Sequence, residues 1–210
     1  MPRSAKQTNE AWKITGTERN LRGDDRDIVM TMGLAPVDTL YPDPENTRLF
    51  SVRQDKYDGE KLTAEQSFEE LWKLSSVKLL YQGILSAKGL TEALLVHPDG
   101  MVMEGNERLT ALNRIQMGLE DGLFEEEEKV ALHELLQNIP IRILPDDLTA
   151  KEQALMLADL HLGGKDDWDA VNQAKAVYDM SARLGITPTE ISYRLRKSRT
   201  WGYQRITAYK

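Results

Sequence analysis

Apolar residues in the middle of the chain recur at the spacing of helices and short strands. A helix is predicted over residues 64–74, because apolar positions repeat there every three to four residues. Thr63 precedes it and Gln66 lies three residues on, which is the spacing of a capping box. A second helix should cover residues 77–87 and end at Gly89, since glycine readily forms a left-handed C-terminal cap.

The next segment predicts a hairpin followed by two helices and a strand. Two short apolar runs in residues 93–104 flank Pro98-Asp99-Gly100, and Asp-Gly is a strong signal for a tight turn. Helical spacing returns over residues 106–118 and again, after an acidic start, over residues 125–136. Residues 139–145 alternate as a strand.

Beyond this strand the pattern is helical throughout. Thr187, Pro188 and Glu190 form a helix start with the spacing of a capping box, and only a short turn separates this helix from the last one. Two helices joined in this way cross steeply, as a helix-turn-helix requires. The four expected helices cover residues 149–160, 167–184, 187–195 and 200–209.

These elements predict an α+β protein with an α/β domain followed by an all-helical domain. We expect a flexible N-terminal arm over residues 1–35, because this segment lacks periodicity. The α/β domain should cover residues 36–145. The helical domain should cover residues 146–210, with the helix-turn-helix at about 187–209.

The composition is that of a soluble globular protein, with 40% hydrophobic and 29% charged residues. No run approaches eighteen apolar residues and no export signal is visible, so we expect a cytoplasmic protein without a membrane span. Cysteine is absent, which excludes disulfides, thiolate zinc sites and a cysteine nucleophile. Three scattered histidines do not form a metal-binding pattern, and we predict no metal site.

Positive charge is concentrated at the end of an acidic chain. The formal net charge is -7, yet residues 181–210 hold seven Lys and Arg residues against Glu190 as the single acid, a net charge of +6. Such concentration beside a capped helix pair favours DNA binding over an ordinary solvated helix surface.

The helix-turn-helix hypothesis assigns a role to each residue type. The shared core should consist of Ile186, Ile191, Leu195 and Ile206. Side chains at the start of the second helix reach base edges, whereas cations nearby hold phosphates. The residues expected at base edges are Ser198, Arg199, Thr200, Tyr203 and Gln204. The residues expected on phosphates are Arg194, Arg196 and Lys197.

A second candidate site is the strand-to-helix corner VMEGNERLTAL. Exposed N–H groups at a helix N-terminus attract phosphate, glycine permits close approach, and an arginine in the first turn adds a charge-assisted contact. The alternative is a structural corner, with Asn106 as N-cap and Arg108 in a surface ion pair.

The segment GLTEALLVHPDGMVMEGNERLTALNRI resembles the core of the ParB/sulfiredoxin-like fold, and IPIRILPDDLTAKEQALML resembles the ParB segment that follows. The resemblance covers roughly residues 36–210. It implies a ParB-like DNA-binding protein of DNA partition, plasmid or phage type. Its expected partners are double-stranded DNA, a partition ATPase and a second copy of the chain in a homodimer.

The resemblance also implies a nucleotide site, with CTP or ATP and magnesium as the cofactor. The Gly-x-x-Arg box corresponds to Gly105, Asn106, Glu107 and Arg108, where Glu107 replaces the first of two adjacent arginines. The second box falls on ADLHLGGKDDWDA, in which His161 and Lys165 are weaker candidates for nucleotide contact. The alternative for His161 is a helix-end cap.

The competing functional class is a nucleotide-dependent enzyme, a nuclease, an NTPase or a small-molecule kinase. Glu104 and Glu107, with Asp99, could then bind magnesium through hard oxygen ligands. A third hypothesis makes the α/β domain only a dimerisation platform. The cationic helix pair favours the DNA-binding protein over both.

Overall fold

The computed structural model describes residues 10–20, 26–162 and 170–210 and divides into two compact units. The first unit comprises the described residues up to Asn20 together with 28–46 and 61–146. The second comprises 26–27, 47–60 and the described part of 147–210. Each unit has its own core.

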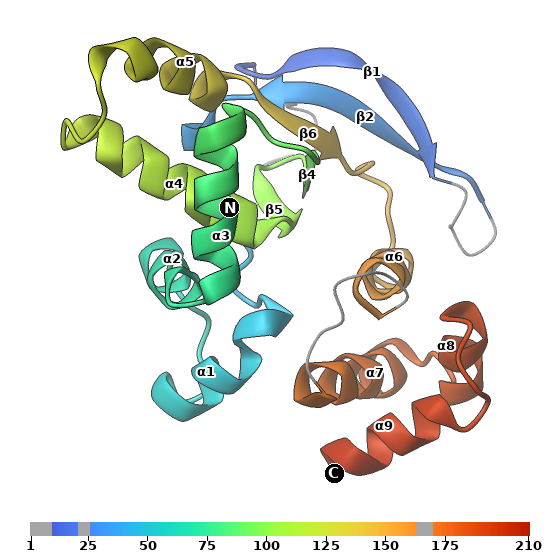
Figure 1. Cartoon of the computed structure of the whole chain (residues 1–210). Coiled ribbons are helices and arrows are strands. Elements are labelled where there is room, and N and C mark those ends of the chain that lie inside the picture. The colour runs from blue at the N-terminus through green and yellow to red at the C-terminus, as the bar shows by residue number, and fades with distance from the viewer. Residues whose placement is uncertain (1–9, 21–25, 163–169) are drawn as a thin grey trace, which may run out of the picture. The chain divides into compact units, whose positions relative to one another are not determined.

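A six-stranded mixed sheet forms the framework of the first unit (Figure 1), in the order β1-β2-β6-β4-β5-β3. Neighbouring strands pair antiparallel except for β3 with β5 and β4 with β6, which are parallel. The strands are β1 (Lys13–Asn20), β2 (Ile28–Ala35), β3 (Tyr41–Pro42), β4 (Leu94–Val96), β5 (Met101–Glu104) and β6 (Ile139–Ile143).

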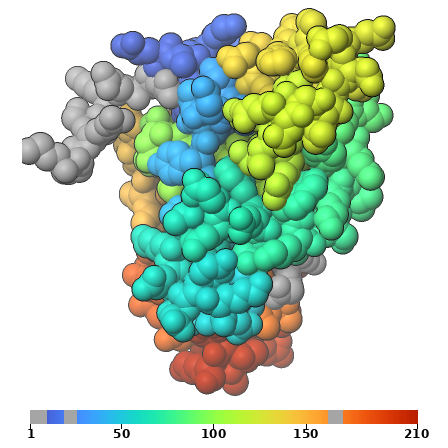
Figure 2. Space-filling model, turned by 90° about the vertical axis from the view of Figure 1, so that its left-hand side faces the viewer, coloured from blue at the N-terminus to red at the C-terminus, as the bar shows by residue number. Residues whose placement is uncertain are grey.

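Helices of the first unit bury their apolar sides against this sheet. They are α2 (Ala64–Trp72), α3 (Ser75–Ala87), α4 (Asn106–Glu120) and α5 (Glu126–Gln137), with a short 3₁₀ helix η1 (Val37–Thr39). Residues of α3, α4 and α5 share one core with β4, β5 and β6. Figure 2 shows the outer surfaces of α2 and α3 in teal and green. The predicted capping box is confirmed, since Thr63 Oγ1 accepts from Gln66 N at 3.2 Å and Gln66 Oε1 from Thr63 N at 2.9 Å.

The hairpin between β4 and β5 turns at the predicted Asp-Gly pair. Gly100 N donates to His97 O at 2.9 Å, and His97 N donates to Met101 O at 2.8 Å. Gly100 has φ +101°, and a Cβ there would lie 2.4 Å from Thr39 O. Glycine is therefore required by both the backbone conformation and the close approach.

The expectation of a flexible arm over residues 1–35 is wrong for two segments. β1 and β2 form a hairpin, and β2 pairs with β6 from Thr31 to Ala35. β1 lies at the edge of the sheet and most of its described side chains face solvent, so its sequence has no apolar alternation. Residues 1–9 and 21–25 lie outside the described residues.

The second unit is helical. Its elements are η2 (Thr47–Leu49), α1 (Phe50–Lys56), α6 (Ala150–Leu162), α7 (Ala170–Leu184), α8 (Pro188–Arg194) and α9 (Trp201–Tyr209). The predicted core residues Ile186, Ile191 and Leu195 are buried, and Ile206 packs against them. No helix in the described ranges combines the length and the apolar character needed to cross a bilayer.

Residues 47–60 join the helical unit, although their place in the sequence assigns them to the α/β domain. Phe50 of α1 and Tyr178 of α7 both contact Tyr209 at the end of α9, with ring centroids 6.1 and 4.8 Å away. These rings fix the C-terminal end of α9. Residue spacing within the helical segment gives no sign of this partner, because Phe50 is about 160 residues away in the chain.

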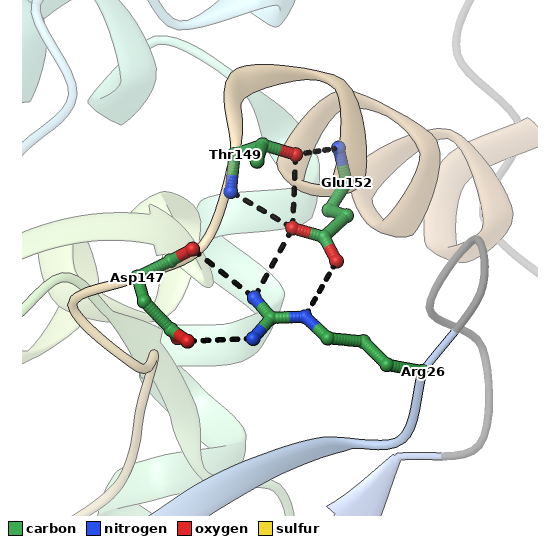
Figure 3. A network of polar contacts seen from close by, with 4 residues as sticks. All are labelled: Arg26, Asp147, Thr149 and Glu152. Atoms are coloured by element: carbon green, nitrogen blue, oxygen red, sulfur yellow. Dashed lines mark hydrogen bonds and ion pairs between the residues drawn. The ribbon is translucent and has the colours of Figure 1, made fainter.

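The start of α6 is held by a network around Arg26 (Figure 3). The guanidinium donates to Glu152 Oε1 at 2.8 Å, to Asp147 Oδ2 at 2.6 Å and to the Asp147 carbonyl at 3.0 Å. Thr149 N and Oγ1 each donate to Glu152 Oε2 at 2.9 Å. Hydrogen bonds from Arg26, and then those from Thr149, lower the pKa of Glu152 to about 2.

Candidate nucleic-acid interface

Helix α8 begins as its sequence predicts, with one difference. Thr187 Oγ1 accepts from Glu190 N at 3.1 Å, and Pro188 occupies the first turn, where its missing N–H is harmless. The Glu190 carboxylate pairs with Lys151 of α6, with Oε1 and Nζ 3.1 Å apart. The predicted capping box is therefore only half formed, and Glu190 joins two helices instead.

A glycine brings α9 into direct contact with α8. Gly202 N donates to Ser192 Oγ at 2.9 Å, and Ser192 Oγ donates to Pro188 O at 2.8 Å. A Cβ on Gly202 would lie 2.5 Å from Pro188 O, so no larger residue fits without a shift of the backbone. The sequence analysis missed both residues. The available signal was a glycine in the first turn of a predicted helix, which indicates close packing.

The turn between α8 and α9 presents three cations to solvent. Leu195 is the C-cap of α8 and is buried in the core of the helical unit. Arg196, Lys197 and Arg199, which follow in the turn, are exposed. Within the described part of the chain these three side chains make no ion pair. Carboxylates of the described residues therefore do not neutralise their charges.

The predicted base-contacting residues lie on the exposed side of this helix pair. Ser198, Arg199 and Thr200 are exposed before α9 begins at Trp201, and Tyr203 is 53% exposed. Gln204 is exposed as well. The same face continues with Thr207 and Ala208, because positions three and four apart share one side of a helix. Thr207 is a member of this face that the sequence analysis did not identify.

Two further arginines flank the surface in different ways. The guanidinium of Arg205 lies 5.3 Å over the ring of Trp201, on the partly buried side of α9. Arg194, predicted to hold a phosphate, is half-buried and lines a shallow hollow with its neighbours. The residues of this hollow are Tyr193, Arg194, Arg196 and Lys197.

The second candidate site, at the start of α4, is built from internal contacts. Gly105 is the N-cap with φ 97°, and a Cβ there would lie 2.5 Å from Leu94 Cδ2. Asn106 is buried, accepts from Asp43 N at 3.1 Å and donates to Val102 O at 2.9 Å. The expectation that Asn106 is the N-cap is therefore wrong. Its amide links α4 to β5 and to Asp43, the residue that follows β3.

The arginine of this box is also engaged within the fold. Its side chain is 11% exposed and donates to Glu92 O at 2.9 Å, to Ala93 O at 3.3 Å and to the Glu104 carboxylate at 2.5 Å. Arg108 thus holds the segment that leads into β4. Nucleotide binding by Gly105, Asn106, Glu107 and Arg108 stays a prediction, and these contacts weigh against it.

The catalytic and metal hypotheses gain no support from the same region. Across residues 10–20, 26–162 and 170–210, no group of three or more His, Cys, Asp or Glu residues could hold a metal ion. Glu104 pairs with Arg108, and Asp99 accepts from Met101 N at 3.0 Å in the hairpin turn. Glu107 lies in the first turn of α4, where the helix dipole favours an acid.

The two weaker nucleotide candidates come from the second box. His161 is half-buried near the end of α6, which continues to Leu162. Lys165 lies outside the described residues. Their contact with a nucleotide stays a prediction.

Comparisons with known proteins find similarity to solved structures alone. No family model matches the chain, and no curated protein matches it. Among solved structures, the chain is similar to the C-terminally truncated chromosome-partitioning protein ParB from Caulobacter crescentus, complexed with CTP-gamma-S. The identity is 14% and the TM-score 0.30, over 91% of this chain and 77% of that one. The α+β class itself is shown by the mixed sheet and the helices that follow it.

Proposed function

We propose that this protein binds double-stranded DNA through the surface of α8, the following turn and the exposed face of α9, here called the α8–α9 surface. One observation carries the proposal. Arg196, Lys197 and Arg199 are exposed without carboxylate partners in the described chain, directly beside the uncharged face that begins at Thr200.

This arrangement suits the two kinds of contact that a DNA duplex offers. Exposed cations neutralise phosphates and release counterions, which supplies affinity that depends on salt. Uncharged side chains on a helix face, such as Tyr203 and Gln204, can hydrogen-bond to base edges and so read sequence. Phosphate contacts position the protein, and base contacts specify the site.

Titration of labelled duplex DNA by fluorescence anisotropy tests the proposal, after an enriched sequence has been selected from random duplexes. Arg199→Ala and Lys197→Ala should each weaken binding, and the salt slope should fall by about one per lost phosphate contact. Lys78→Ala removes an exposed cation from α3 and serves as the matched control, with affinity unchanged. If Arg199→Ala and Lys197→Ala bind DNA as the wild type does, the α8–α9 surface is not the DNA interface.

The class of DNA transaction is the finer part of the proposal. The resemblance of residues 36–210 to ParB proteins supports a role in DNA partition or a related plasmid or phage process, with a partition ATPase and a second copy as partners. Measurement of ATP hydrolysis by a partition ATPase, with and without this protein and its selected DNA, tests that role. A rate that this protein leaves unchanged would remove partition from the proposal and leave DNA binding standing.

A further inference from the structure

Tyr193 is the most exposed large hydrophobic residue on the α8–α9 surface. Its side chain is 87% exposed, on the last turn of α8. Together with Arg194, Arg196 and Lys197 it lines the shallow hollow at the end of this helix. An aromatic ring with a hydroxyl group, set among three cations, is the composition of a site for a phosphate and its attached sugar.

The backbone at Arg196 supplies a second, independent observation. α8 ends in a Schellman motif, in which Arg196 N donates to Tyr193 O at 3.1 Å and Lys197 N to Ser192 O at 2.9 Å. Arg196 occupies the left-handed position of this motif, with φ 53°. Glycine is the residue that suits this position, because a Cβ is disfavoured there. A residue other than glycine at such a position is uncommon and calls for an explanation.

A purely structural explanation exists for a cation at this place. Positive charge near the C-terminal end of a helix interacts favourably with the helix dipole, whatever the helix binds. Lys88 offers a direct comparison, since it ends α3 in the same left-handed conformation, with φ 49°, and is also exposed. Any stability effect of a cation in this setting should be similar at the two positions.

We infer that the hollow at the end of α8 binds one phosphodiester group of the DNA backbone, with Arg196 as its anchoring cation and Tyr193 against the adjoining sugar. The inference rests on the proposed function. To the phosphate contact predicted for Arg196 it adds a defined hollow and the sugar contact of Tyr193, a residue that sequence analysis had not singled out. Lys197 and Arg194 contribute positive charge at the rim of the hollow.

Replacement of Arg196 and of Lys88 by glycine, each in turn, distinguishes an effect on DNA binding from an effect on folding. Arg196→Gly should melt at or above the wild-type temperature, because glycine relieves the backbone, and should bind the selected duplex about tenfold more weakly, with a salt slope lower by about one. Lys88→Gly makes the same chemical change on α3 and should retain full affinity. Tyr193→Ala should weaken binding about threefold without changing the melting temperature, since a sugar contact is lost and no core contact.

The outcomes distinguish this inference from the proposed function. If Arg199→Ala weakens binding while Arg196→Gly and Tyr193→Ala bind as the wild type does, the hollow is not a phosphate subsite, and the α8–α9 surface still binds DNA. If the wild type binds no duplex, the proposed function fails and the inference with it. Binding of CTP that Arg196→Gly abolishes, with DNA binding unchanged, would assign the hollow to a free nucleotide and overturn the inference.

Discussion

Arg108 and Arg196 are two arginines with opposite roles in the same chain. Each lies within three residues of a helix end and at or near a residue with positive φ. For Arg108 that residue is Gly105, and for Arg196 it is Arg196 itself. Arg108 donates hydrogen bonds to two carbonyls and a carboxylate of its own unit. Arg196 is exposed and makes no ion pair within the described ranges.

A motif therefore does not determine the role of its arginine. A phosphate can bind only to donors that the fold leaves accessible, and the guanidinium of Arg108 already has acceptors. The sequence predicts phosphate contacts for both GNER and LRKSR, yet the contacts in the structure favour the second segment alone. Arg108 is here called an internal cation, because its donors are used within the fold, and Arg196, Lys197 and Arg199 are called external cations, because they are exposed. Substitutions can test this division.

The largest effect is expected from Arg108→Ala. The substitution leaves two carbonyl groups and the partly buried Glu104 without their donor, and should lower the free energy of unfolding by about 2–3 kcal/mol. Urea unfolding measures the change. Arg196→Ala is the matched control and should alter stability by less than about 0.5 kcal/mol. Equal stability of the Arg108→Ala variant and the wild type would show that this guanidinium is free for a ligand, and would reopen the nucleotide hypothesis.

A change in helix packing should affect the external cations indirectly. Gly202→Ala places a methyl group against Pro188 O and should lower the free energy of unfolding by about 2 kcal/mol, with a loss of DNA affinity, because α9 must shift. Gly83→Ala on α3, where a Cβ meets nothing within 4 Å, is the control and should be neutral or stabilising. Wild-type DNA affinity in Gly202→Ala would mean that the contact between α8 and α9 does not set the interface.

Arg26 is a third arginine, bound internally in the helical unit, and its contribution should depend on pH. The folded pKa of Glu152 lies at about 2, below its ordinary value of 4.5. The pair therefore stabilises the fold above about pH 4.5, and this stability is lost as the pH falls from 4.5 towards 2. Because Arg26 is exposed, solvent screening should keep this loss small.

Urea midpoints at pH 7 and pH 3 measure this dependence. Arg26→Gln should be less stable than the wild type at pH 7, and the difference should narrow at pH 3. A difference of the same size at both pH values would contradict the role of Glu152 ionisation.

The smallest effect is expected at Thr207, the exposed residue of α9 that sequence reasoning missed. Thr207→Ala should lower affinity for the selected duplex by about threefold and leave affinity for random duplex unchanged, since a base-edge contact affects specific binding alone. Competition anisotropy with both duplexes measures the two affinities. An equal loss on both would place Thr207 on the phosphate backbone.

The elements that the sequence predicted are those whose signals are local. β6 alternates buried Ile139, Ile141 and Ile143 with less buried residues, as its sequence indicates. Thr63 and Gln66 form the capping box that their spacing predicts. The exposed cations of the α8–α9 turn were likewise predictable from charge and helix spacing, because no distant segment among the described residues covers them.

Features that depend on distant residues could not be predicted. The position of β1 follows from its pairing with β2, since its own side chains are mostly polar and carry no alternation. Phe50 reaches Tyr209 although the two residues lie far apart in sequence. The carbonyl partners of Arg108 could not be predicted, because Glu92 and Ala93 precede it by two strands and a turn. Local patterns do not reveal such contacts.

The salt dependence of DNA affinity decides whether the external cations bind phosphates. If the external cations bind phosphates, log K for the wild type should fall against log salt concentration with a slope of about −3 or steeper, and the triple substitution of Arg196, Lys197 and Arg199 by Ala should reduce that slope by about three. A slope near zero for the wild type, or an unchanged slope in the triple variant, would contradict the account.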